Sequence, residues 1–139
     1  MLVKKITFED FMDGHERTEE FCFHLSESEL AMLNYELEGG LENYFKQIVN
    51  AENNYELIKL FQKLISISFG VRSLDGKHFR KSEEALADFK STDAYNKLFM
   101  ELSTNDEAAI AFIKGILPAK MAAEIKDEEV KQLAASASN

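Results

Sequence analysis

The chain has 139 residues, 45% of them apolar, with 25 acidic and 16 basic side chains and a formal net charge of −9. This length and apolar content predict one domain that buries enough surface to fold without disulfides or a metal, and the single cysteine excludes a disulfide within the chain. The negative charge argues against nucleic acid as a partner, and no apolar run approaches the roughly 20 residues that span a membrane.

The acidic charge is concentrated in the first part of the chain. Residues 6–56 hold thirteen acidic and two basic side chains, whereas residues 57–139 hold twelve of each. Such a surface can steer the domain toward a basic protein, and it can equally serve only to keep the domain in solution. The N-terminus lacks the pattern of a signal peptide, and a lone cysteine fits a reducing cytoplasm.

The N-terminal part, to about residue 25, predicts a β-hairpin. Phe8 lies in one stretch of alternating apolar and polar residues, Phe21 and Phe23 lie in a second, and Asp13-Gly14 between them is typical of a tight turn. A hairpin of two strands is marginally stable by itself. We therefore expect it to pack on a helix, to join another sheet or to pair with another subunit.

Three helices are predicted next. Ser26 and Glu29 have the spacing of a capping box at the start of the first helix, and the second helix follows with its own apolar stripe. The third helix, about residues 55–68, is apolar around most of its surface, which predicts a central position in a bundle. Gly70 is expected to end it.

A small second hairpin is a further candidate element near residues 70–80, where an Asp-Gly pair forms a turn signal. Residues 71–81 carry four basic side chains against one acidic side chain. This segment allows contact with nucleic acid, with Phe79 stacking on a base. The favoured interpretation is a solvated basic loop in which Val71, Leu74 and Phe79 pack into the core.

The remaining sequence predicts further short helices. Ser82 and Thr92 are expected to cap two of them, and Thr104 with Glu107 is expected to open a last helix through a second capping box. Residues 119–139 predict a marginal helix followed by a flexible C-terminal tail, because they contain few bulky apolar residues.

Together these elements predict a mainly α fold. We expect a single domain of residues 1–118, formed by a compact bundle of five to seven helices. The N-terminal β-hairpin (about residues 1–25) and the small hairpin near residues 70–80 would add to this bundle.

The sequence lacks the residue patterns of an enzyme, a cofactor site or a metal site. Cys22 and His24 form the one nucleophile–base pair that is close in sequence, and no third residue is placed to orient them. His15 and His78 are too distant in the predicted fold to complete a zinc site. No glycine-rich phosphate loop occurs. We therefore predict a non-catalytic protein with no catalytic, metal-binding or cofactor-binding residues.

The aromatic side chains point instead to protein binding. The chain has eleven phenylalanines and four tyrosines, and an exposed apolar patch with an acidic rim marks a protein-binding surface. The hairpin is the element most in need of a partner, so its phenylalanines are the predicted partner-binding residues: Phe8, Phe11, Phe21 and Phe23. They would act through pairing at the strand edge or by presenting an aromatic face.

One part of the chain has a recognisable motif. The motif comprises the run SFGVRSLDGKHFRKS at residues 68–82, the run FKSTDAY at residues 89–95 and the run LFMEL at residues 98–102. The pattern resembles that of the tail assembly chaperones of tailed bacteriophages and prophages, with Phe69 where a tyrosine is expected. The resemblance covers roughly residues 51–117.

The resemblance implies a non-catalytic protein that binds and solubilises the tape measure protein during tail tube assembly. The tail tube protein is a second implied partner, and nucleic acid and membranes are not. The implied location is the host cell cytoplasm, with no place in the mature virion. A structural protein of the tail (tube, connector or completion component) and an acidic regulatory protein that binds a basic host partner remain alternatives. The sequence leaves open whether the chain is a monomer or a homo-oligomer.

Overall fold

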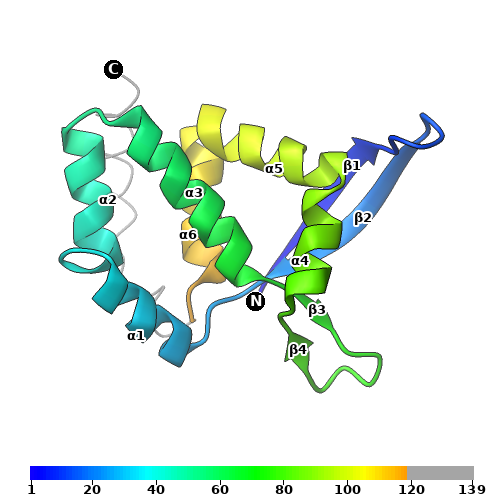
Figure 1. Cartoon of the computed structure of the whole chain (residues 1–139), viewed down its shortest axis with the longest axis horizontal. Helices are drawn as coiled ribbons and strands as arrows, with labels where there is room; N and C mark the ends of the chain where they lie inside the picture. The colour runs from blue at the N-terminus through cyan, green and yellow to red at the C-terminus, as the bar shows by residue number, and fades with distance from the viewer. Residues whose placement is uncertain (119–139) are drawn as a thin grey trace.

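The structure, a computed structural model, describes residues 1–118 (Figure 1). Its strands are β1 (Leu2–Glu9), β2 (Glu16–Phe23), β3 (Phe69–Arg72) and β4 (Phe79–Arg80). Its helices are α1 (Glu27–Glu36), α2 (Gly40–Asn50), α3 (Asn54–Ser68), α4 (Glu83–Lys90), α5 (Asp93–Thr104) and α6 (Asp106–Ile116). The marginal helix and tail predicted for residues 119–139 lie outside the described residues.

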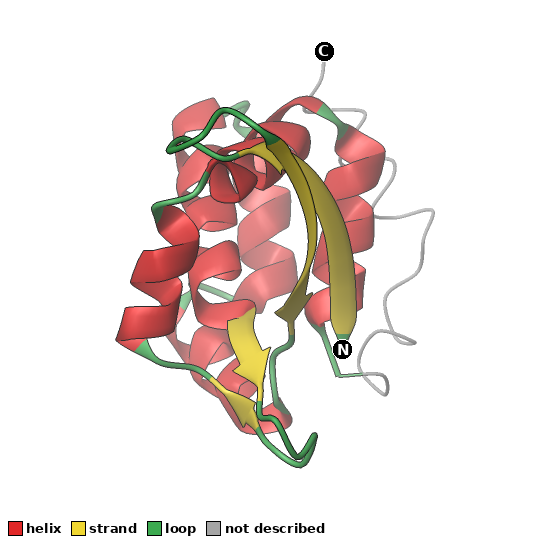
Figure 2. Cartoon of the chain, turned by 90° about the vertical axis from the view of Figure 1, so that its right-hand side faces the viewer, coloured by secondary structure: helices red, strands yellow, loops and turns green. Residues whose placement is uncertain are grey.

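All four strands belong to one antiparallel sheet with the order β1-β2-β3-β4. The long β1–β2 hairpin extends from one end of this sheet, and the short β3–β4 hairpin extends from the other (Figure 2). Both predicted hairpins are therefore confirmed. The prediction of five to seven helices is confirmed by six in residues 1–118, and the sheet makes the fold mixed α/β rather than purely a helical bundle.

The two hairpins are joined into one sheet by a short tertiary pairing. Cys22 and Phe23 at the end of β2 pair with Gly70 and Phe69 at the start of β3. These segments are far apart in the sequence. Because β3 begins directly after α3, their pairing depends on the position at which α3 ends in the fold. Local alternation of apolar and polar residues signals each strand but not its neighbour.

Side-chain caps set the starts of two helices as the sequence predicts. The Ser26 hydroxyl accepts a hydrogen bond from the Glu29 backbone N–H at 3.2 Å, and the Ser26 backbone N–H donates to Glu29 Oε1 at 3.0 Å. The Ser82 hydroxyl accepts from the Ala85 backbone N–H at 3.1 Å. Each bond satisfies a backbone donor that has no partner within its helix.

Two other predicted caps are wrong in detail. Thr92 precedes α5, but its hydroxyl donates to the Phe89 carbonyl oxygen at 2.7 Å and caps nothing. Thr104 is the last residue of α5, and Asn105 caps α6 by accepting from the Ala108 backbone N–H at 3.0 Å. A threonine hydroxyl competes for carbonyls of the preceding turn, which explains both differences.

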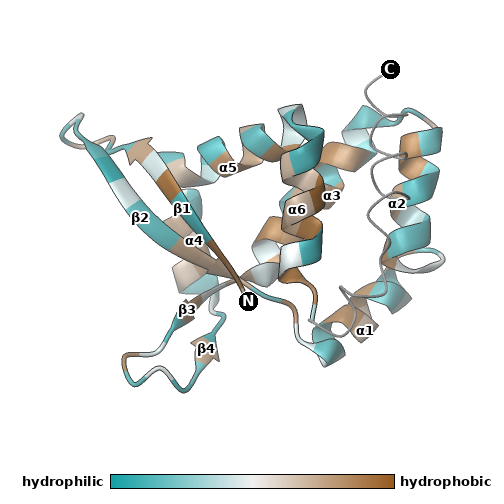
Figure 3. Cartoon of the chain, turned by 180° about the vertical axis from the view of Figure 1, so that it is seen from behind, coloured by the Kyte–Doolittle hydropathy of each residue, from teal (hydrophilic) through white to brown (hydrophobic). Residues whose placement is uncertain are grey.

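The core lies between the helices and the inner face of the sheet. Helix α3 is central as predicted, since Leu64 and Ile65 are fully buried. Apolar residues of the helices gather toward this interior, whereas β2 is hydrophilic along most of its length (Figure 3). None of the helices in residues 1–118 combines the length and hydrophobicity of a membrane span.

Candidate partner-binding surfaces

The four phenylalanines predicted to bind a partner are divided between core and surface. Phe8 is 2% exposed and Phe23 is fully buried, while Phe21 is partly buried. Phe11, in the turn of the β1–β2 hairpin, is 63% exposed. Of the four, Phe11 therefore has the accessible ring that a docking surface needs.

A chain of aromatic contacts explains why the other three rings lie inside. The ring centroids of Phe8 and Phe21 are 6.1 Å apart, those of Phe21 and Phe89 are 4.9 Å apart, and those of Phe23 and Phe112 are 5.4 Å apart. These contacts attach the hairpin to α4 and α6. Side chains alternate between the two faces of a strand, and the register places all three rings on the same face of the sheet. Aromatic rings gathered on one face indicate that this face packs against the core.

The outer part of the β1–β2 hairpin is strongly acidic. We call residues 9–20 the acidic tip; it holds six acidic side chains and Arg17, a net charge of −5. Arg17 forms two ion pairs: its Nη1 lies 3.4 Å from Asp10 Oδ2, and its Nη2 lies 3.7 Å from Glu19 Oε1. Met12 beside Phe11 is 95% exposed. The acidic tip thus combines accessible apolar side chains with excess negative charge.

Two acidic residues of the acidic tip are cross-strand neighbours. Glu9 at the end of β1 and Glu16 at the start of β2 are paired residues in the antiparallel register. Neither forms an ion pair with a described residue. Like charges on directly opposed cross-strand residues destabilise a hairpin.

A hollow lies beside this tip, between the hairpin turn and the start of α5. Its volume is about 360 Å³, and Phe8, Phe11 and Met12 supply its apolar lining. Its charged lining comes from three carboxylates and one guanidinium: Glu9, Asp10, Asp93 and Arg17. The hollow thus combines an apolar lining with charged side chains of both signs.

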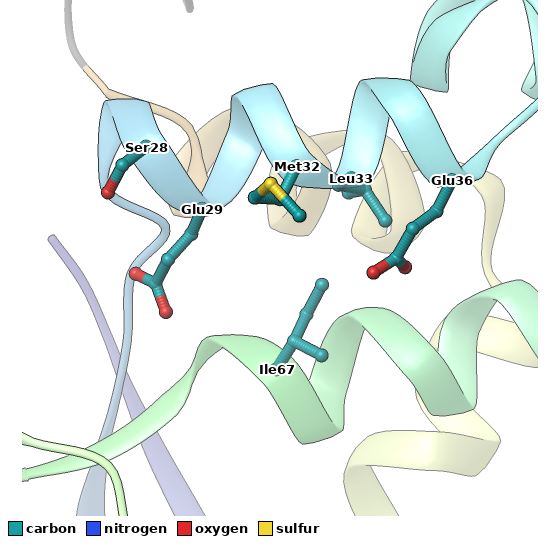
Figure 4. A pocket seen from close by; sticks show the side chains of 6 residues that line it. All are labelled: Ser28, Glu29, Met32, Leu33, Glu36 and Ile67. Carbon is teal, nitrogen blue, oxygen red and sulfur yellow. The ribbon is translucent and has the colours of Figure 1, made fainter.

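A second hollow is an apolar groove between α1 and α3 (Figure 4). Met32 and Leu33 of α1 and Ile67 of α3 line a volume of about 280 Å³, and Met32 is 61% exposed. Met32 and Ile67 point toward each other across the groove, with Glu29 and Glu36 at its two ends. We call this the α1–α3 groove.

Ion pairs neutralise both acidic ends of the α1–α3 groove. Lys81 Nζ donates to Glu29 Oε2 at 2.7 Å, and Lys63 Nζ donates to Glu36 Oε2 at 2.7 Å. Burial raises the pKa of Glu29, but hydrogen bonds from Lys81 and from the Ser26 backbone outweigh it and leave the pKa below its ordinary value. Each carboxylate of the rim is thus paired with a lysine, which suits an apolar occupant.

The side chains of Cys22 and His24 form no hydrogen bond with each other in the described part of the chain. Cys22 lies on β2, and His24 follows the end of that strand, where its backbone N–H donates to the Ser68 carbonyl oxygen at 2.8 Å. His24 Nδ1 is buried and makes no hydrogen bond with a described residue. Within residues 1–118, no three side chains of His, Cys, Asp or Glu gather as metal ligands would.

The β3–β4 hairpin carries a basic surface. We call residues 71–81 the basic tip; its net charge is +3. The expectation that Val71 and Leu74 pack into the core is wrong, because Val71 is 48% exposed and Leu74 is fully exposed. The tight turn places Leu74 beyond the reach of any helix, whereas Phe79 is partly buried against Gly70.

Three cations of the basic tip have no carboxylate partner among residues 1–118: Arg72, Lys77 and Arg80. The fourth, Lys81, is held by Glu29. In a chain with a net charge of −9, unpaired basic side chains on one hairpin are unexpected. The sequence shows the charge of this segment but not its lack of partners.

Comparison with known proteins gives one result. A family model described as phage tail assembly chaperone matches residues 1–139, the whole chain. No curated protein and no solved structure matches the chain.

Proposed function

The chain belongs to the family of phage tail assembly chaperones, and from this premise we propose that it binds and solubilises the tape measure protein during tail tube assembly. It acts without catalysis, in the host cell cytoplasm, and is absent from the mature virion. Its task is to cover apolar surface of a long helical partner until the tube encloses that partner.

The α1–α3 groove is the observation that carries this proposal. It lies between α1 and α3, its lining includes Met32, Leu33 and Ile67, and Met32 is an exposed, flexible side chain that adapts to different apolar partners. An amphipathic helix binds such a groove by inserting side chains spaced three or four residues apart. The groove is short, so it fits a few side chains of the partner.

The paired rim supports an apolar ligand over a charged one. Apolar side chains that cover Glu29 or Glu36 displace water from carboxylates that already have lysine partners. An unpaired buried carboxylate costs far more than a paired one. The groove can therefore close over an apolar helix without leaving an uncompensated charge.

Co-expression with the tape measure protein of the same phage tests the proposal. We expect the chain to raise the soluble fraction of the tape measure protein and to co-purify with it. Met32→Lys should abolish both effects, because it places a charge across the groove. Met100→Lys is the matched control, since Met100 is 54% exposed on α5 and does not line the groove.

Three outcomes would overturn the proposal. The first is a tape measure protein that is no more soluble with the chain than without it. The second is equal binding by Met32→Lys and the wild type, which would remove the groove from the interaction. The third is stoichiometric recovery of the chain from purified virions, detected by mass spectrometry, which would identify a structural protein of the tail.

A further inference from the structure

We propose that residues 119–133 cover the α1–α3 groove of their own chain until a partner helix displaces them. The occupant of the empty groove is thus the segment that directly follows the described residues. The inference concerns the regulation of the groove, and it rests on the proposed function only for the identity of the partner that competes. Coverage of the groove is testable without that partner.

The point at which the described chain ends is the first argument. The Leu25 backbone N–H donates to the Ile116 carbonyl oxygen at 2.7 Å, and Leu25 lies two residues before the start of α1. Figure 1 shows the end of α6 approaching the start of α1. Residue 119 therefore continues the chain from beside the first turn of α1, where Glu29 lines one end of the groove.

Length is the second argument. The groove extends along α1 from Glu29 to Glu36, a distance of about 10 Å at the helical rise of 1.5 Å per residue. Residues 119–139 are 21 residues, which span about 30 Å even when they are helical. A segment that begins at one end of α1 is therefore long enough to follow the groove to its other end.

The apolar pattern of the segment matches the short groove. Met121 and Ile125 are four residues apart, a spacing that places both side chains on one face of a helix. Alanines at positions 122 and 123 allow the backbone of such a helix to approach a surface closely. Two apolar side chains inserted against Met32 and Ile67 remove apolar surface of both elements from water.

The charges of the segment are compatible with the rim of the groove. Residues 119–133 hold three basic and four acidic side chains, a net charge of −1. Glu129 follows Ile125 by one helical turn, toward the end of the groove at which Lys63 pairs with Glu36. The Lys63 side chain is 40% exposed, so its ammonium group is accessible to a second carboxylate.

A contact within one chain regulates the groove without high affinity. A tethered segment has an effective concentration in the millimolar range, so even a weak contact is formed much of the time. A groove that is covered for about nine tenths of the time binds its partner about tenfold more weakly. A partner helix with more apolar side chains than the segment still displaces it, and Met32 is covered until that partner arrives.

Disulfide trapping in the full chain tests the contact without any partner. In a Cys22→Ser background, which removes the only native thiol, Met32→Cys and Ile125→Cys should form a disulfide within one chain. The matched control pairs Ile125→Cys with Met100→Cys, because Met100 is 54% exposed on α5 and does not line the groove. We expect the Met32 pair to form at least about tenfold faster in a glutathione redox buffer.

Mass spectrometry and non-reducing electrophoresis identify the product of trapping. Equal rates for the two cysteine pairs would overturn the inference, because a segment that does not dock reaches both positions by chance. Disulfide-linked dimers would also overturn it, because a second copy would then supply the segment.

Partner affinity tests the regulatory consequence. Ile125→Lys in the full chain should lower the dissociation constant for a soluble fragment of the tape measure protein by about threefold or more, because it uncovers the groove. Val130→Lys is the matched control: it adds the same charge to the segment five residues later, on a different helix face, and should bind as the wild type does. Isothermal titration calorimetry measures each dissociation constant.

The two proposals fail in different ways. Unchanged affinity in Ile125→Lys, together with loss of binding in Met32→Lys, would overturn the regulation and leave the proposed function intact. Wild-type affinity in Met32→Lys would overturn the proposed function, and disulfide trapping would still decide whether the segment covers the groove.

Discussion

The ring of Phe79 lies over the backbone of Gly70, so that a Cβ atom on residue 70 would come within 2.6 Å of Phe79 Cζ and 3.0 Å of the Arg80 carbonyl oxygen. Gly70 was expected to end the third helix, but α3 ends at Ser68 and Gly70 lies within β3. The glycine is thus required by close packing between two strands. Both residues belong to the run that resembles tail assembly chaperones.

Replacing Gly70 by alanine should destabilise the chain. The added methyl group must push the Phe79 ring away and shift β4, and overpacking of this kind costs about 1–3 kcal/mol. The free energy of unfolding, measured by urea denaturation, should fall by that amount. A double-mutant cycle with Phe79→Ala identifies the cause. In the Phe79→Ala background, Gly70→Ala should cost at least about 0.5 kcal/mol less, and strictly additive effects would contradict the packing argument.

Local signals in the sequence predict most elements of the fold. The hairpin turns, the Ser26 capping box and the central helix all depend on residues that are close in sequence, and the structure contains each of them. The joining of the hairpins into one sheet was not predictable, because it depends on the pairing of Cys22 with Gly70 across the fold. Pairing between distant segments has no local signature.

The candidate site was harder to predict than the fold. The sequence shows that Phe8, Phe11 and Phe23 are aromatic residues of one hairpin, but not which of them meet α4 and α6. Exposure depends on tertiary contacts, so the sequence does not show that Phe8 and Phe23 are buried; partner binding by the hairpin stays a prediction. The α1–α3 groove was missed for the same reason: Met32 and Ile67 belong to different helices and meet only in the folded chain.

Alanine substitutions at the hairpin phenylalanines should separate core from surface. Phe23→Ala should lower the free energy of unfolding by about 3–5 kcal/mol, because it leaves a cavity among buried rings. Phe11→Ala should change it by less than about 0.5 kcal/mol, because Phe11 is 63% exposed. Chemical denaturation of both variants measures the difference. Equal losses of stability would show that the turn of the hairpin packs on the domain.

Substituting lysine for Glu16 should stabilise the monomer. The lysine would lie opposite Glu9 and replace a repulsive cross-strand pair by an attractive one. We expect Tm to rise by about 1–3 °C at low ionic strength, with a smaller rise in high salt. Glu16→Gln should raise Tm by a smaller amount, since it removes the repulsion between the two carboxylates without adding an attraction. A Tm below that of the wild type would mean that the two carboxylates do not repel each other.

Acidification should destabilise the chain through His24. Burial of the ring lowers the pKa of His24 below its ordinary value of 6.5; the positive N-terminus and Lys81 act in the same direction, and Glu29 opposes them. The unfolded chain therefore binds this proton more readily than the folded chain. Stability is complete above about pH 6.5 and falls as the pH drops from there toward the pKa of the folded state.

Urea denaturation at pH 7.5 and at pH 5.5 measures the effect of His24. The wild type should have a lower free energy of unfolding at pH 5.5, and His24→Gln should lose part of this pH dependence. His78→Gln is the matched control because His78 is exposed on the basic tip, and it should retain the wild-type dependence. Glu29 stays ionised across this window, since its pKa lies below the ordinary 4.5. If His24→Gln retained the pH dependence of the wild type, groups other than His24 would be responsible for the lower free energy of unfolding at pH 5.5.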